Sequence, residues 1–246
     1  MKNKKMPAAL IATLMLGVGN SEASSSFNSQ ATLSFMIDSI TYINNPSDLS
    51  GLAILGSFEQ AGSPISYISS TGNGSVAANN PGVGPVSVTI GSPLIHTFSI
   101  NGNASNGTVE SSNVGWYALA LNNSSAIDNY SVNLTLGYNL LANASGEFAN
   151  SDVILDAYTN NNPLLGNIFV NANSLSSQNA GANGSFPQYT FDIAHGSSLV
   201  FYADVTINSS LQASPVPLPA VVWSFLAGLL GILGSNKRKS SFGKSA

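Results

Sequence analysis

Two stretches of the sequence alternate apolar and polar residues with a period of two. Residues 130–140 (YSVNLTLGYNL) carry Tyr, Val or Leu at every second position, and residues 198–207 (SLVFYADVTI) repeat this arrangement. Such alternation places every apolar side chain on one face of a β-strand, whereas a helix would scatter the same residues around its axis. Both stretches therefore predict strands with one buried face.

Further strands are indicated by two shorter patterns. A brief alternation runs through Leu33, Phe35 and Ile37, and residues 114–121 (VGWYALAL) are apolar at nearly every position. A run that is apolar on both faces is typical of a central strand buried on both sides. On this interpretation Trp116 is a core residue.

Turn signals separate these runs. The dipeptides Asn101-Gly102, Asn106-Gly107 and Asn183-Gly184 accept positive φ and predict hairpin turns. Residues 69–85 and 160–163 predict loops, and no segment of the body sustains a helical period with caps. The predicted fold is mainly β, an antiparallel β-sandwich over residues 24–207, with a partly open barrel or a β-solenoid as the alternatives.

The charged residues are few and unevenly placed. They make up 7 % of the chain, against roughly 25 % in an ordinary soluble domain. Every basic residue lies near an end, and the body from residue 24 to 236 contains no Lys or Arg. Of the eleven Asp and Glu, all except Glu22 lie in this body, so its formal charge is about −10. A surface without cations cannot release the counterions of nucleic acid, and we expect no nucleic-acid partner. The chain also contains no Cys, which excludes disulfides, thiol nucleophiles and zinc–thiolate sites.

The first residues predict an export signal. Lys2, Lys4 and Lys5 precede an apolar run over residues 7–18, and Ser21-Glu22-Ala23 places small side chains three residues and one residue before a cleavage bond. This is the pattern of a signal peptide over residues 1–23, used by the Sec export machinery and cleaved between Ala23 and Ser24. An uncleaved anchor is the alternative.

The other end of the chain predicts a single transmembrane helix. Residues 216–234 are uncharged and mostly apolar, and they precede a basic cluster. As a helix they would span about 28 Å, close to the roughly 30 Å hydrocarbon core of a bilayer. Pro217 and Pro219 favour an extended start, so the helix would begin near Ala220, with the basic residues on the cytoplasmic side. Residues 208–215 are predicted to be a linker, residues 240–246 form the tail, and a buried core helix is the alternative to a membrane helix.

This C-terminal arrangement resembles a PEP-CTERM sorting domain in its VPLPA variant. The resemblance covers residues 216–239, and Leu218 stands where the Pro-Glu-Pro form has Glu. It implies recognition by an exosortase, a membrane cysteine protease-transpeptidase of Gram-negative bacteria that processes its substrates near the motif. It further implies an exported protein that passes from an inner-membrane-anchored precursor to the cell surface or extracellular matrix, in association with exopolysaccharide, biofilm or floc. The matching residues are the motif Val216, Pro217, Leu218, Pro219 and Ala220, and the basic cluster Lys237, Arg238 and Lys239.

Candidate catalytic and metal-binding residues are sparse. His96 and His195 are the only histidines, and neither belongs to a His-Glu-x-x-His pair, nor is there a Gly-x-Ser-x-Gly nucleophile motif. Asp152 and Asp156 share one face of a strand, where they would hold a cation or act as paired carboxylates, or would simply be solvated. We expect no enzymatic activity, a strand position for His96, and no cofactor. A dispersed Ser, His and Asp triad, and weak calcium binding by scattered Asp and Asn oxygens, are the alternatives.

Two classes of function are compatible with these features. The first is an exported structural or interaction protein of the cell surface or matrix, without a reaction of its own. The alternative is a carbohydrate-binding module on the same sorting signal, and a secreted hydrolase is a third. Sugar binding is suggested by aromatic residues that could stack on pyranose rings, with core packing as the competing interpretation, favoured for Trp116. These residues are Trp116, Tyr117, Tyr42, Tyr67, Tyr158 and Tyr202.

Overall fold

The computed structural model describes residues 23–42, 49–60, 67–79, 82–161, 164–214, Phe225 and 227–229. The chain divides into a compact unit from Ala23 to Ser214 and a second unit that holds residues 1–22 and 215–246. In the second unit, Phe225 and residues 227–229 are helical. Within the described residues no helix is long and apolar enough to cross a membrane, and most of the predicted span 216–234 lies outside them.

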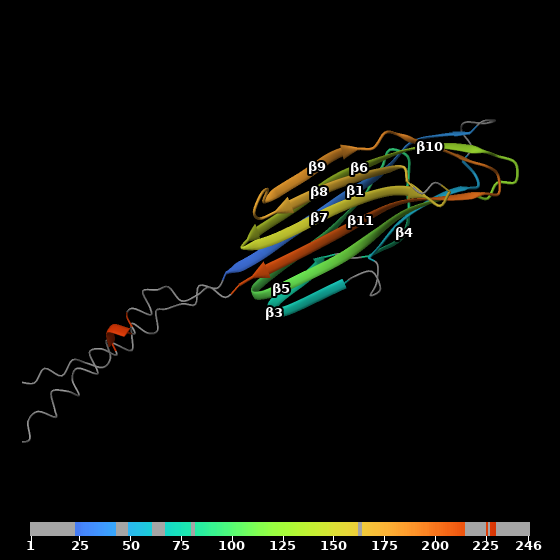
Figure 1. The fold of residues 1–246 in the computed structure, drawn as a ribbon. Coiled ribbons are helices and arrows are strands. Elements are labelled where there is room, and N and C mark those ends of the chain that lie inside the picture. Colours follow the sequence, from blue (N-terminus) through green and yellow to red (C-terminus); the bar gives the residue numbers. More distant parts are fainter. Residues whose placement is uncertain are drawn as a thin grey trace, which may run out of the picture. The chain divides into compact units, whose positions relative to one another are not determined.

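The compact unit consists of antiparallel strands, as Figure 1 shows, and this confirms the prediction of a mainly β fold. Every strand pair among the described residues is antiparallel. The strands are β1 (Ser24–Tyr42), β2 (Leu52–Gln60), β3 (Tyr67–Asn79), β4 (Val83–Ser87), β5 (Leu94–Asn123), β6 (Tyr130–Gly146), β7 (Phe148–Thr159), β8 (Gly166–Asn173), β9 (Asn179–Ser185), β10 (Tyr189–Ile193) and β11 (Ser198–Ala213).

The described strands belong to one hydrogen-bonded sheet. Its main path has the order β10-β6-β1-β5-β11-β7-β8, while β9 pairs with β6, β2 and β3 pair with β5, and β4 pairs with β2. β5 changes its partner near Asn106, because Ser24 of β1 pairs with Ser105 and Ala213 of β11 pairs with Gly107. The first strand of the compact unit therefore begins where the last one ends.

The sheet folds over at this change of partner. Ser25 Oγ donates to the carbonyl oxygen of Gln212 at 2.7 Å, and the rings of Phe35 and Phe201 lie 5.9 Å apart. Because residue numbers rise along β1 while they fall along β11, these two strands run side by side in opposite directions. β5, which is antiparallel to both, must reverse its direction between them. Asn106 has the positive φ expected of an Asn-Gly step, 53°, but it lies inside β5, so the hairpin predicted at Asn106-Gly107 is a bend within one strand.

This reversal gives the compact unit two layers that are joined at a corner. β1 and β6 contact β7 across the interior, and β6 also contacts β8. The compact unit is thus a single curled antiparallel sheet, nearer to the partly open barrel than to the two separate sheets of the predicted sandwich, since β5 and β3 continue from one part to the other.

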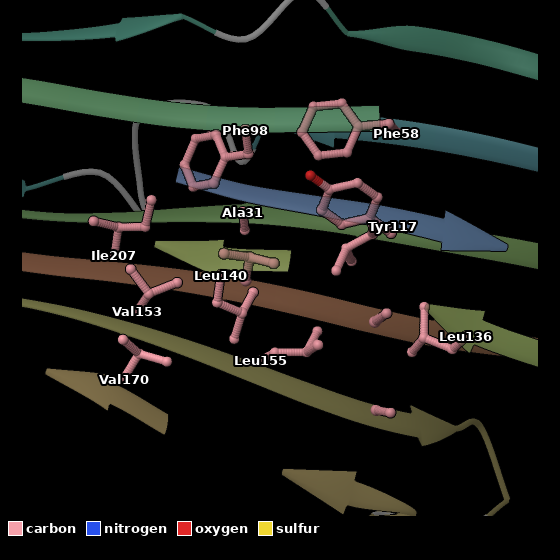
Figure 2. Packing of buried hydrophobic residues seen from close by; sticks show 14 of the residues in the cluster. Ala31, Phe58, Phe98, Tyr117, Leu136, Leu140, Val153, Leu155, Val170 and Ile207 are labelled. Carbon is pink, nitrogen blue, oxygen red and sulfur yellow. The ribbon is translucent and has the colours of Figure 1, made fainter. Parts of the chain in front are cut away.

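The hydrophobic core lies between the two layers. Figure 2 shows Leu140 of β6 near Val153 and Leu155 of β7, with Phe58, Phe98 and Tyr117 clustered beside them. Both long alternations contribute their apolar positions, so the strands predicted over residues 130–140 and 198–207 are confirmed. The shorter alternation in β1 is confirmed as well. The buried residues of these three strands include Leu33, Phe35, Ile37, Tyr130, Val132, Leu134, Leu136, Leu140, Phe201, Ala203, Val205 and Ile207.

The other two predicted Asn-Gly hairpins are wrong as well. Asn101-Gly102 lies within β5 and Asn183-Gly184 lies within β9. Gly102 is needed for a close approach instead, because a Cβ at this position would come within 2.4 Å of the Phe27 ring. The segment 69–85, predicted to be a loop, forms most of β3 and the start of β4.

The domain boundary at residue 207 also needs correction. β11 continues to Ala213, so residues 208–213 form strand rather than a linker. This part of β11 pairs with both β5 and β7, and Leu211 is buried between them. At the other end, β1 begins at Ser24, next to the cleavage bond predicted after Ala23.

Candidate functional site

Trp116 points out of the sheet rather than into the core. Its side chain is 39 % exposed, whereas the next residue, Tyr117, faces the interior and is 1 % exposed. The expectation that Trp116 belongs to a strand buried on both faces is therefore wrong. The outward neighbours Val114, Ala118 and Ala120 are only half-buried, which shows that this face of β5 is not covered by a second layer.

Two tyrosines lie on the same outer face as Trp116. Tyr202 of β11 pairs in register with Ala118 of β5 on one side and with Tyr158 of β7 on the other. The two tyrosine rings are stacked, with centroids 5.0 Å apart and planes at 20°. Aromatic side chains presented in this way combine a flat apolar surface with a polar tip.

These aromatic residues line an open groove of about 510 Å³, which we call the aromatic groove. Its volume falls within the range of about 300–1,000 Å³ that is common for small-molecule sites in proteins. The lining residues are Ser57, Trp116, Ala118, Tyr158, Asn160 and Tyr202.

Two carboxylates lie next to the aromatic groove, on the neighbouring strands β11 and β7. Asp204 of β11 pairs in register with Trp116 on one side and with Asp156 of β7 on the other, and Asp156 pairs with Asn167 of β8. The Tyr158 hydroxyl donates to Asp204 Oδ2 at 2.6 Å, and Asn167 Nδ2 donates to Asp156 Oδ1 at 2.5 Å. We call Asp204 and Asp156 the acidic pair.

The environment of Asp204 disfavours its charged form. Burial raises the pKa of this carboxyl to about 6, and the charge of Asp156 acts in the same direction, while the hydrogen bond from Tyr158 opposes them. Asp204 Oδ1 is buried and accepts no hydrogen bond. Burial also raises the pKa of Tyr158, which stays a neutral donor, and the hydrogen bond to Asp204 adds to that shift.

The other tyrosines proposed for sugar binding take different positions. Tyr42 is buried and its hydroxyl donates to Asp128, while Tyr117 packs in the core against Phe58. The side chain of Tyr67 lies outside the described residues. The structure thus brings Trp116, Tyr158 and Tyr202 to one surface and leaves Tyr42 and Tyr117 inside.

The two histidines do not form a catalytic arrangement with the groove. His96 lies in β5, as predicted, with its ring stacked on Phe58 at 3.8 Å, and burial lowers its pKa. His195 is exposed in the turn before β11, where its backbone N–H donates to Asn129 Oδ1 at 2.9 Å.

Asp152 and Asp156 lie on one face of β7, as their spacing predicted. Each accepts hydrogen bonds from asparagine side chains, Asp152 from Asn150 and Asn171 and Asp156 from Asn167. Over the ranges that the structure describes, no three His, Cys, Asp or Glu side chains are grouped so that they could hold a metal ion.

The sorting motif 216–220 and the basic cluster 237–239 lie outside the described residues, as does the predicted signal peptide up to residue 22. Comparison of the chain with known protein families, with curated proteins and with solved structures finds no match. The residues of the compact unit and the sequence motifs at its two ends therefore carry the functional assignment.

Sequence reasoning missed Asn160 and Ser57 as parts of the groove and Asp204 as its acidic neighbour. Asp204 could have been found from the alternation in residues 198–207, because it shares the outward face with Tyr202. Asn160 and Ser57 belong to other segments, and no local pattern connects them with Trp116.

Proposed function

We propose that this chain is an exported protein of the cell surface or extracellular matrix whose compact unit binds carbohydrate polymers, without a reaction of its own. The observation that carries this proposal is the exposed Trp116 beside the stacked Tyr158 and Tyr202 in one groove. The aliphatic face of a pyranose ring packs on such rings, while amide, hydroxyl and carboxylate groups bind its hydroxyls. This proposal combines the carbohydrate-binding module, the second class of function considered from the sequence, with the sorting signal.

The export and sorting half of the proposal rests on the sequence at the two ends. The signal-peptide pattern precedes Ala23, and the VPLPA-type motif is followed by an apolar segment and a basic cluster. We propose that residues 216–234 provide the membrane helix from which an exosortase releases or transfers the protein.

Binding of polysaccharide by residues 24–214 tests the carbohydrate half, because this fragment contains the whole described sheet and its core. A glycan array identifies ligands, and affinity electrophoresis in soluble polysaccharide gels measures them. Trp116→Ala should weaken binding at least about tenfold, since truncation of a central aromatic residue commonly removes a large part of a binding energy.

Phe148→Ala is the matched control for that variant. Phe148 is 37 % exposed, almost the same as Trp116, and it lies outside the residues that line the aromatic groove. Equal loss of binding in both variants, or unchanged binding in Trp116→Ala, would show that the groove is not a carbohydrate site.

A further inference from the structure

The charge around the aromatic groove restricts which carbohydrate it can accept. Asp204 pairs in register with Trp116, and Asp156 pairs with Asp204. Because neighbouring strands lie about 4.8 Å apart, a sugar ring stacked on Trp116 lies about one strand spacing from the backbone of Asp204 and about two from that of Asp156. A substituent on that ring, or on the next sugar along the polymer, therefore meets this acidic pair.

No Lys or Arg of the compact unit balances these two carboxylates. Lys and Arg are absent from residue 24 to residue 236, so none occurs in any strand of the sheet. The described groups at the groove that donate hydrogen bonds to the carboxylates, the Tyr158 hydroxyl and the Asn167 amide, are neutral. The negative charge is therefore compensated only by solvent ions or by a ligand.

Classes of carbohydrate differ in how they interact with the negative charge of the acidic pair. A uronic-acid or sulfated polymer would bring like charges close to the acidic pair, which is unfavourable at short range. A neutral polymer would donate hydroxyl hydrogen bonds to the carboxylates but would bring no charge to balance theirs. A protonated amine supplies both a positive charge and several hydrogen-bond donors, and bonds between ammonium and carboxylate are stronger than neutral ones.

We propose that the aromatic groove selects amino-sugar polymers with free amines, such as β-linked glucosamine chains. This inference rests on the proposed carbohydrate function and adds the class of sugar. The aromatic rings hold the apolar face of the chain, and the acidic pair accepts the ammonium groups. Removal of the amine charge by acetylation removes the preference while it leaves the stacking surface in place.

The test compares three oligosaccharides of equal length by titration calorimetry on residues 24–214, at low salt and just below neutral pH. They are a glucosamine oligomer, its fully N-acetylated form and an oligogalacturonate. We expect the free-amine oligomer to bind at least tenfold more tightly than the acetylated form, and the uronate not to bind. Asp156→Asn, which keeps an oxygen that can accept from Asn167, should reduce this preference severalfold, because it weakens binding of the free-amine oligomer more than binding of the acetylated one.

Asp192→Asn controls for general attraction between an acidic protein and a polycation, because Asp192 is exposed on β10 and outside the groove. An equal effect of Asp192→Asn and Asp156→Asn would overturn the inference. Polylysine provides a second test: if it binds, and this binding is lost in Asp156→Asn but kept in Trp116→Ala, the inference is also overturned. Calcium-dependent binding of the uronate in place of the glucosamine oligomer would also overturn it. Equal, Trp116-dependent binding of the free-amine and acetylated oligomers would reject this inference alone, whereas binding that ignores Trp116 would reject the proposed function itself.

Discussion

Gly72 and Gly107 lie at the corner where β5 reverses, and neither position has room for a side chain. A Cβ on Gly107 would lie 2.0 Å from the carbonyl oxygen of Thr71. A Cβ on Gly72, whose φ is +70°, would lie 2.2 Å from the carbonyl oxygen of Asn106. Both obstacles are backbone atoms, so a larger residue must push β3 and β5 apart at the place where the two layers join.

Gly107→Ala should therefore destabilise the compact unit. Forcing an extra carbon into a close-packed position costs about 1–3 kcal/mol, and we expect a loss of this size in the free energy of unfolding. Urea denaturation followed by tryptophan fluorescence measures it. Gly84→Ala in β4 is the control, because a Cβ there meets nothing within 4 Å. Equal urea midpoints for the two variants would contradict the close approach at the corner.

The raised pKa of Asp204 predicts that the free energy of unfolding of the compact unit depends on pH. Burial raises its pKa from 3.8 to about 6 in the folded protein. Between these two values the folded state binds more protons than the unfolded chain, so this group's contribution to stability falls as pH rises and stays low above the folded pKa. The amide in Asp204→Asn cannot ionise, so this variant does not lose stability as pH rises through the pKa of Asp204. Its unfolding free energy relative to the parent should therefore be higher at neutral pH than near pH 4.

Chemical denaturation of both proteins across this pH range gives the difference directly. Titrating groups that do not interact with Asp204 affect parent and variant alike, so they cancel in the comparison, whereas Asp156 and Tyr158 interact with Asp204. Asp192→Asn, which removes an exposed carboxylate, should show no such trend. A constant gap between Asp204→Asn and the parent would mean that Asp204 ionises as easily in the folded protein as in the unfolded chain.

At the scale of strands, the sequence predicts where strands form better than which residues meet across them. The alternation in residues 130–140 and 198–207 identified parts of β6 and β11 because a period of two leaves only one face for the core. The same reasoning failed for Trp116, since the small residues Val114, Ala118 and Ala120 tolerate a half-buried face as well as a core. Only the neighbours of a strand decide between these two environments.

The prediction of turns and of the candidate site is limited in the same way, because both depend on residues that are distant in the sequence. Asn101-Gly102 and Asn106-Gly107 carry the same local signal, yet of the two asparagines only Asn106 adopts a positive φ, at the bend of β5, whereas Gly102 provides space for the ring of Phe27. Tyr158 and Tyr202 were candidates by residue type alone. Their stacking depends on the strand order β5-β11-β7 and on its register, which no local pattern of the sequence encodes.

The end of β11 gives a prediction for a whole strand segment. Residues 208–213 pair with β5 and β7, and Leu211 is buried against Val109 and Ala149 of these strands. The fragment 24–207 should therefore be less stable than the fragment 24–214 by at least about 2–5 kcal/mol, the usual effect of removing one buried Leu side chain. Urea midpoints of the two fragments measure the difference. Identical midpoints would mean that this segment is a linker after all.

At the scale of the whole molecule, the two ends of the compact unit meet while the groove lies far from them. Ser24 and Ala213 pair with Ser105 and Gly107, on either side of Asn106. Along β11, the stretch from Asp204 to Ala213 spans about 30 Å at the usual rise of an antiparallel strand. A compact unit held through its C-terminal end would thus keep the aromatic groove well away from its point of attachment, which suits a protein that binds a polymer outside the cell.

The sorting proposal makes its own prediction for the intact precursor. Proline fixes φ and disfavours helix in the residue before it, so we expect Pro217 and Pro219 to favour an extended segment ahead of the proposed membrane helix. Replacing both prolines with alanine would let the helix extend through this segment and remove the extended substrate that an exosortase would bind. In a host with a matching exosortase, we expect the double variant to remain a full-length anchored precursor, detected by the mass of its retained C-terminal tail. Pro215→Ala changes a proline just before the motif and should be processed like the parent. Equal processing of the double variant and the parent would leave residues 216–239 as a plain membrane anchor, because the motif prolines would then have no role in recognition.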